Sequence, residues 1–202
     1  MQFLMKNWGV YAKLLFVTLT ARNADKRALI LEATLRVLRE RGLSGLKIED
    51  VAKAAEIGKG TVYLYFRDKK ALLRALVERR TLDFYADAEA ITREDAPFFE
   101  RLEKLIERRL AFIDEWRGLW AAVASEAVEG DKESWLKGLH ERYQRILERF
   151  IKAGVEAGEL RPVDARMAAA ALAAMGCSPQ LDLPREPYLK TLVEIWKKGV
   201  GA

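Results

Sequence analysis

The sequence predicts an all-α protein, and three observations support this prediction. Apolar residues recur every three or four positions from Asn23 onward, whereas the strict alternation that marks a strand is almost absent. Half of the 202 residues are hydrophobic, which is enough to build a core. The net charge is +6 over residues 23–80 and −4 over residues 81–202. A compact basic part beside an acidic body indicates that the basic part meets a polyanion.

Residues 1–22 are an N-terminal extension that we leave out of the fold prediction. Lys6 and Lys13 interrupt its apolar residues, so no 18-residue apolar run exists and we do not expect a membrane span. A short extra helix, a start codon assigned too early, and a signal peptide ending near Ala21 are the readings left open. We favour the first two, because the rest of the chain has a cytosolic character.

The N-terminal domain, residues 23–67, is expected to contain three helices. The first covers residues 24–41 and stops at Gly42, where a C-terminal glycine belongs. The second begins at Ile48, with two acids in its first turn, where the helix dipole favours them. A turn at residues 56–58 leads into the third.

The C-terminal domain, residues 68–202, is expected to be a helical bundle. Asp68 caps a long helix, and amphipathic segments follow it, separated by glycine and proline. These segments cover residues 96–116, 118–130, 131–154, 163–176 and 187–199. The proline-rich stretch 178–187 is the clearest loop.

The stretch GKGTVYLYF, residues 58–66, places more polar side chains in one short span than a core helix uses. Residues 47–66 read as a short helix, a tight turn and a second short helix, which is the helix-turn-helix pattern. In this motif the second helix, here Lys59 to Tyr65, enters the DNA major groove. Val62 and Phe66 are expected to face the core.

The remaining side chains of this second helix suit contact with a duplex. Gly60 allows the backbone to approach DNA, and Thr61 offers a hydroxyl and a methyl group to base edges. Tyr65 and Lys69 suit phosphates, and Lys69 also lies in the first turn of a helix, where the amide groups attract anions. The residues of this stretch that we expect to face DNA are Lys59, Gly60, Thr61, Tyr63, Tyr65 and Lys69.

Residues 30–73, and GKGTVYLYFRDKKALL above all, resemble the DNA-binding domain of the tetracycline-repressor (TetR) family of bacterial regulators. The resemblance implies three N-terminal helices that bind DNA, a fourth that links to a ligand-binding body, and two final helices that dimerise. By position, Thr61 and Tyr63 match residues that meet bases or nearby backbone. Tyr65 and Lys69 match residues that contact phosphates.

Two positions depart from the family pattern. Lys47 stands where a threonine usually starts the second helix, so it is a poor cap, although it can still reach a phosphate. Glu56 stands where the turn glycine is usual. If that position needs a positive φ, the strain is about 1 kcal/mol. Either change is expected to weaken DNA affinity or reshape specificity.

The body carries many aromatic residues at helical spacing. A core explains such a stripe, and so does a cavity for an apolar ligand, which the resemblance implies. The pocket residues that we predict are Phe84, Phe112, Trp116, Trp120 and Tyr143. A fatty acyl chain, an acyl-CoA and an aromatic compound all remain candidates for the ligand. The arginines nearby are either solvated or hold a carboxylate or phosphate of that ligand.

Two C-terminal helices are predicted to form a homodimer interface. The first is almost free of side-chain bulk from Ala168 to Ala174, so it can pack closely against another helix. The second carries a stripe of Leu189, Leu192, Val193 and Trp196. A contact of this stripe within its own chain is the alternative. A palindromic DNA site requires two recognition helices in either case.

We therefore expect a cytoplasmic, ligand-responsive repressor that binds a palindromic operator as a homodimer. A constitutive DNA-binding protein and a ligand-activated regulator are the alternatives. The sequence offers no nucleophile–base pair, metal site or cofactor motif, so we expect no catalysis. The single cysteine, Cys177, fits a reducing compartment, and the single histidine, His140, is interpreted as a surface helix residue.

Overall fold

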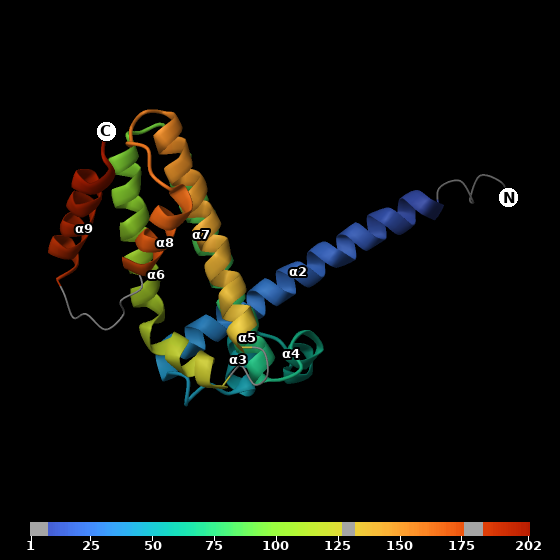
Figure 1. Ribbon diagram of the computed structural model, residues 1–202. Coiled ribbons are helices and arrows are strands. Elements are labelled where there is room, and N and C mark those ends of the chain that lie inside the picture. Colours follow the sequence, from blue (N-terminus) through green and yellow to red (C-terminus); the bar gives the residue numbers. More distant parts are fainter. Residues whose placement is uncertain (1–7, 127–131, 176–183) are drawn as a thin grey trace. The chain divides into compact units, whose positions relative to one another are not determined.

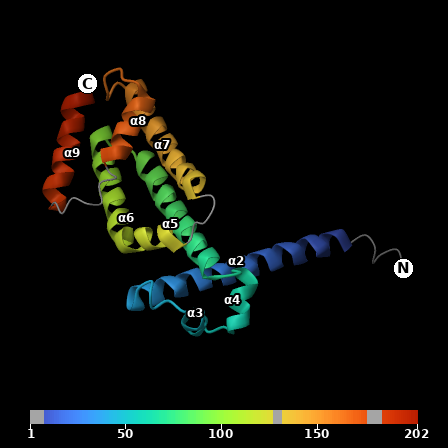
Figure 2. The same cartoon turned by 60° about the horizontal axis from the view of Figure 1, so that its bottom comes forward.

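The computed structural model describes residues 8–126, 132–175 and 184–202, and within these ranges the regular structure is helical, with one isolated bridge between Leu160 and Gly201. Figures 1 and 2 show the helices from two directions. Their bounds are α2 (Trp8–Arg41), α3 (Ile48–Ala54), α4 (Lys59–Tyr65), α5 (Lys69–Thr92), α6 (Phe98–Glu126), α7 (Lys132–Glu156), α8 (Ala165–Met175) and α9 (Arg185–Val200). The all-α prediction is confirmed. None of the described helices is both long enough and apolar enough to cross a bilayer.

The chain forms two compact units, Met1–Leu76 and Val77–Ala202. The division falls inside α5, nine residues after the boundary that we placed at residue 67. Helix α5 is therefore one continuous element of 24 residues that contributes to both units. Its start is capped as expected, because Asp68 Oδ1 accepts a hydrogen bond from the Ala71 N–H at 2.7 Å.

Helix α2 is longer than the sequence suggested. It runs without a break from Trp8 through the region that we treated as an extension, for 34 residues in all. The physical reason is that these residues contain no proline, and a single glycine near the start does not end a helix. The helix ends where predicted: Gly42 has a φ of +67°, and its N–H donates to the Leu38 carbonyl at 2.9 Å.

The first unit has its core between α2 and the two short helices, which lie together along α2 in Figure 2. Helices α3 and α4 have seven residues each, which is too short for stability in isolation. Burial stabilises them, by about 1.5–3 kcal/mol for each large apolar side chain removed from water. The buried residues that supply this core include Ile30, Val37, Leu38, Ile48, Val51, Ala52, Ala55, Val62 and Phe66.

The second unit is a bundle of α6, α7, α8 and α9 with the C-terminal part of α5 (Figure 1). The segments that we predicted at 96–116 and 118–130 are a single helix, α6, which continues to Glu126. The break that we expected at Gly118 was wrong. One glycine in a helix interior costs about 1 kcal/mol, which the rest of a long helix offsets.

The Glu159 side chain, from the loop after α7, binds the first turn of α6. Glu159 accepts a hydrogen bond from the Phe98 N–H at 2.6 Å with one carboxylate oxygen and pairs with Arg101 at 3.0 Å with the other. Beside this contact, Gly154 on α7 leaves room for the Phe98 ring, which stacks on Phe150 at 4.3 Å. The glycine is required here because a Cβ at position 154 would lie 2.7 Å from that ring.

The C-terminal helices pack on the bundle with their apolar faces. Leu189, Leu192 and Trp196 of α9 are buried, and α9 packs against α6. Most of the stripe that we assigned to the dimer interface is therefore an intrachain contact, because α6 offers an apolar partner within the same chain. Helix α8 packs against α7 in the same way, and its outer face leaves Met167 exposed.

Candidate nucleic-acid interface and ligand cavity

Helix α4 buries one residue, and its other residues are exposed or half-buried. Val62 is fully buried and Phe66 nearly so, which anchors the helix on the first unit. Tyr63 is 45% exposed and Leu64 is 83% exposed. A Cβ on Gly60 would meet no described atom within 4 Å, so this glycine does not serve internal packing. The outer face of α4 is thus an open surface of polar and aromatic groups.

All the residues that the sequence predicted to contact DNA lie in the first unit, and they differ in exposure. Lys47, Lys59 and Gly60 are exposed, together with Tyr63. Thr61, Tyr65 and Lys69 are half-buried. The Lys69 ammonium donates to the Leu43 carbonyl at 3.2 Å, which holds it at the edge of the unit. Leu64 was missed, although its position between two outward tyrosines is a sequence signal for exposure.

Lys59, the first residue of α4, is paired within the motif. Its ammonium donates to Glu49 Oε1 on α3 and lies 5.8 Å from the centre of the Tyr63 ring. The hydrogen bond raises the pKa of Lys59 and lowers the pKa of Glu49. The contact between Lys59 and Glu49 ties the start of α4 to α3. An anion that binds the Lys59 ammonium group would have to displace Glu49.

The turn between α3 and α4 meets the condition that we set for strain at Glu56, because this residue has a positive φ. Glu56 has a φ of +53°, a left-handed conformation that favours glycine. The following Ile57 N–H donates to the Ala52 carbonyl at 3.0 Å, so the turn needs this conformation to close. Lys47 precedes α3 in an extended conformation, and its side chain makes no capping bond at the described start of that helix.

The second unit contains a cavity of about 260 Å³ between α5, α6 and α7. Its lining residues are Thr81, Tyr85, Arg109, Phe112, Leu139, His140 and Tyr143. None of these seven is acidic. A neighbouring crevice beside Arg109 and Tyr143 has about 10 Å³, which is at the limit for a single water molecule.

Aromatic rings form one wall of this cavity. Phe84 stacks on Phe112 at 4.6 Å between ring centres and lies 5.1 Å from the Tyr143 ring. Phe84 itself is fully buried behind this wall and supports it. Trp116 and Trp120 lie on α6, and their side chains fall outside the described residues.

Cationic groups lie close to the same rings. The Arg109 guanidinium is 4.9 Å from the centre of the Tyr143 ring and 5.4 Å from that of Phe84. Burial raises the pKa of Tyr85 to about 12, although the charges of Arg109, Arg142 and Arg145 oppose this shift. Tyr85 is therefore a neutral phenol at physiological pH, and its hydroxyl donates to the Leu139 carbonyl.

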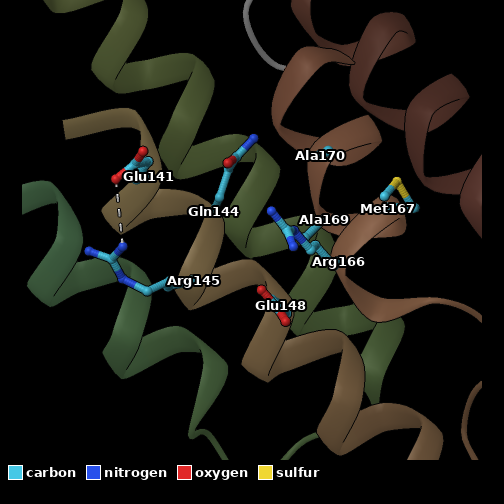
Figure 3. A pocket seen from close by; sticks show the side chains of 8 residues that line it. All are labelled: Glu141, Gln144, Arg145, Glu148, Arg166, Met167, Ala169 and Ala170. Atoms are coloured by element: carbon cyan, nitrogen blue, oxygen red, sulfur yellow. Dashed lines mark ion pairs between the residues drawn. The ribbon is translucent and has the colours of Figure 1, made fainter. Parts of the chain in front are cut away.

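A larger hollow of about 480 Å³ opens between α7 and α8, and its character is different. Figure 3 shows Arg166 reaching from α8 toward α7, while Met167 points away. Charged and polar side chains line it together with two alanines, and Glu141 and Arg145 pair across 4.0 Å. An open, mixed-charge surface of this kind offers little to an apolar ligand.

Sequence reasoning missed four lining residues of the 260 Å³ cavity, Thr81, Tyr85, Leu139 and His140, and it considered Arg109 only as one of several arginines. Thr81 carries a signal, because a hydroxyl stands on the buried face of α5, one turn before Tyr85. The other three need the packing of three helices to be recognised. In the part of the chain that the structure describes, no group of three or more metal-ligating side chains comes together.

Two family descriptions match the chain. Residues 30–76 match "Bacterial regulatory proteins, tetR family", and residues 95–179 match "Tetracyclin repressor-like, C-terminal domain". The HTH-type transcriptional regulator BetI of Burkholderia thailandensis is 32% identical over 160 residues, which cover 74% of this chain and 77% of that protein. The fatty acid metabolism regulator protein of Bacillus subtilis is 25% identical over 142 residues, covering 69% of this chain and 73% of that one.

A solved structure shares the fold. The transcriptional regulator FadR from Bacillus subtilis, in complex with stearoyl-CoA, superimposes with a TM-score of 0.62 at 20% identity, over 83% of this chain and 96% of that one. The first matched region, residues 30–76, contains α3 and α4, so the helix-turn-helix lies within the matched tetR-family region. The chain belongs to the TetR family of bacterial transcriptional regulators, with α3 and α4 as its DNA-binding helix-turn-helix.

Proposed function

We propose that this regulator is a ligand-responsive repressor that binds a palindromic operator as a homodimer and is released by a small molecule. The observation that carries the DNA part is the outer face of α4, where Lys59, Gly60 and Tyr63 are exposed while Val62 alone is buried. A DNA duplex is the partner that best explains a short helix with an exposed lysine and an exposed tyrosine in this motif.

Within this proposal the outward residues have different tasks. Thr61 and Tyr63 contact base edges and so determine sequence preference. Lys47, Tyr65 and Lys69 contact phosphates and so determine register and affinity. Lys59 leaves Glu49 for a phosphate, and Gly60 allows the backbone to approach the duplex.

The dimer in this proposal uses the outer faces of α8 and α9. Met167 on α8 is 64% exposed and Ile195 on α9 is 52% exposed, so each helix presents a large apolar side chain on its outer face. Alanines at positions 168 and 171 share the outer side of α8 and allow another helix to come close. Two such helices from each chain form a four-helix contact about a twofold axis.

The cavity between α5, α6 and α7 is where we place the effector. Its aromatic wall and its few polar groups are typical of small-molecule sites. The relative in Bacillus subtilis that is named a fatty acid metabolism regulator, and the FadR complex with stearoyl-CoA, support a small-molecule response in general.

Helix α5 is the element that couples the two activities in this proposal. It starts at Lys69, one of the proposed phosphate contacts, and it carries Thr81 and Tyr85 of the cavity. A ligand that binds one position of this helix more tightly than another shifts the equilibrium between two arrangements of the recognition helices.

The proposal is tested by selecting DNA from a random duplex pool with the purified protein. We expect an inverted repeat whose half-site centres are about 10 base pairs apart or a multiple of that. The double variant Met167→Asp with Ile195→Asp should be monomeric in sedimentation and should lose preference for the two-half-site duplex. Leu82→Asp, at an apolar position on α5 that is 43% exposed, is the matched control. Selection of single half-sites by wild-type protein, or a dimer that survives the double substitution, would contradict the proposal.

A further inference from the structure

The cavity between α5, α6 and α7 holds groups that an apolar ligand alone does not explain. We infer that it is a site for a small monocarboxylate with a short apolar or aromatic body, whose carboxylate is held by Arg109 and Thr81. This inference rests on the proposed ligand response and specifies its chemistry.

The first observation is the Thr81 hydroxyl. Thr81 is 3% exposed and lines the cavity, yet its Oγ1 has no hydrogen-bond partner among the described residues. Thr34, Thr92 and Thr191 also stand on helices, and each donates to a carbonyl three or four residues earlier. Thr81 does not do this. A buried hydroxyl without a partner is unfavourable, which indicates that a ligand atom completes it.

The second observation is the placement of Arg109. Arg109 lines the cavity, and its guanidinium lies over the Tyr143 ring at 4.9 Å, over Phe84 at 5.4 Å and over Phe112 at 5.9 Å. Contact with three rings restricts the position of this group, so it loses less freedom when it binds an anion. A guanidinium is the side chain best shaped to hold a carboxylate by two hydrogen bonds.

The third observation is the sign of the charge around the cavity. None of the lining residues is acidic, and the charges of Arg109, Arg142 and Arg145 act on the neighbouring Tyr85 hydroxyl. Glu141, on the same helix as Tyr143, pairs with Lys137 and Arg145 instead. A carboxylate entering the cavity therefore meets a positive potential with no competing acid in its described lining.

The size of the cavity limits the rest of the ligand. Pockets for drug-sized ligands span roughly 300–1,000 Å³. At about 260 Å³, this cavity suits a ring or a short chain rather than a long acyl group. Phe112 and Tyr143 provide the apolar faces against which such a body packs.

The test compares each acid with its neutral amide by calorimetry on the full-length protein. The probes are 3-phenylpropanoate with 3-phenylpropanamide, and octanoate with octanamide. We expect each acid to bind at least about tenfold more tightly than its amide, because hydrogen bonds to a charged group are the stronger ones. Equal binding of acid and amide would overturn the inference, and so would tighter binding of stearoyl-CoA than of octanoate.

Two variants separate a ligand contact from a structural role. Arg109→Gln should lower affinity for the acids about tenfold or more and leave affinity for the amides unchanged. Arg108→Gln is the matched control, since the Arg108 guanidinium also lies over the Phe84 ring, at 5.5 Å, but pairs with Asp87 and is not among the lining residues. If Arg108→Gln lowered acid affinity as much, the assignment of Arg109 would be wrong.

Thr81→Val gives a readout that does not depend on Arg109. It replaces the hydroxyl by a methyl group of the same shape, so the melting temperature of the ligand-free protein should rise by about 2–4 °C while acid affinity falls severalfold. A fall in melting temperature would show that Thr81 already has its partner and would overturn the inference.

DNA binding distinguishes this inference from the proposed function. Acids that bind without releasing the selected duplex would contradict the proposed ligand response and leave the carboxylate site standing. Amides that release the duplex as well as the acids do would overturn the carboxylate site and leave the proposed function standing.

Discussion

At the scale of single residues, Glu56 shows how one side chain affects both the fold and the DNA face. Its φ of +53° places it in a region where a side chain other than glycine is strained. It is also an exposed acid in the turn that precedes α4. Conformation and charge can therefore be separated by two substitutions at the same position.

We predict that Glu56→Gly raises the free energy of unfolding by about 0.5–1 kcal/mol, because relief of strain exceeds the added entropy of the unfolded chain. Glu56→Ala removes the charge but keeps the strain, so it should not stabilise the protein. Both should strengthen DNA binding at low salt. Urea unfolding and fluorescence anisotropy measure the two effects, and equal stabilisation by alanine and glycine would refute the explanation.

The candidate site was only partly predictable from single residues. Phe112 and Tyr143 could be proposed as pocket residues because their spacing placed them on inward faces. Arg109 was one of several arginines expected to be either solvated or bound to an anionic group of the ligand, and only packing distinguishes it from Arg108, which pairs with Asp87. His140 was interpreted as a surface residue, and it is exposed, but it also lines the cavity. Which helices meet around a hollow is a tertiary fact that spacing does not contain.

At the scale of elements, local signals predicted the helix-turn-helix well and the long helices less well. Helix α4 has the bounds that its turn and composition indicated, and Asp68 caps α5 as expected. The apolar stripe of α9 was ambiguous, because a dimer partner and α6 in the same chain require the same pattern. The sequence alone cannot choose between two apolar partners.

Two glycines on α7 provide a test of packing against helix propensity. Gly138 is exposed, and a Cβ there would meet no described atom within 4 Å, so Gly138→Ala should stabilise the protein by about 0.5–1 kcal/mol. A Cβ on Gly154 would lie 2.7 Å from the buried Phe98 ring, so Gly154→Ala should destabilise it by about 1–3 kcal/mol. The melting temperature should rise in the Gly138→Ala variant and fall in the Gly154→Ala variant. Stabilisation by both would show that Phe98 moves aside at little cost.

At the scale of the whole molecule, α5 contributes both to the unit that carries the helix-turn-helix and to the helical bundle. The bundle is the acidic part of the chain, and the unit that carries α4 is basic. This division keeps the attraction for DNA on one unit, where α4 is exposed. The ligand response proposed for α5 and the base contacts proposed for α4 involve different residues, so the two proposals can be tested separately.

The most direct test of the central claim, that α4 reads base edges, is the ratio of affinities for the selected duplex and a scrambled duplex across a salt series. Thr61→Ala with Tyr63→Ala should reduce this ratio by about tenfold or more while leaving the salt dependence nearly unchanged. Lys47→Ala should weaken binding to both duplexes equally and lower the salt slope by about one. Lys152→Ala, an exposed lysine on α7, should change neither quantity. A ratio that stays at its wild-type value in the Thr61 and Tyr63 variant would contradict the account.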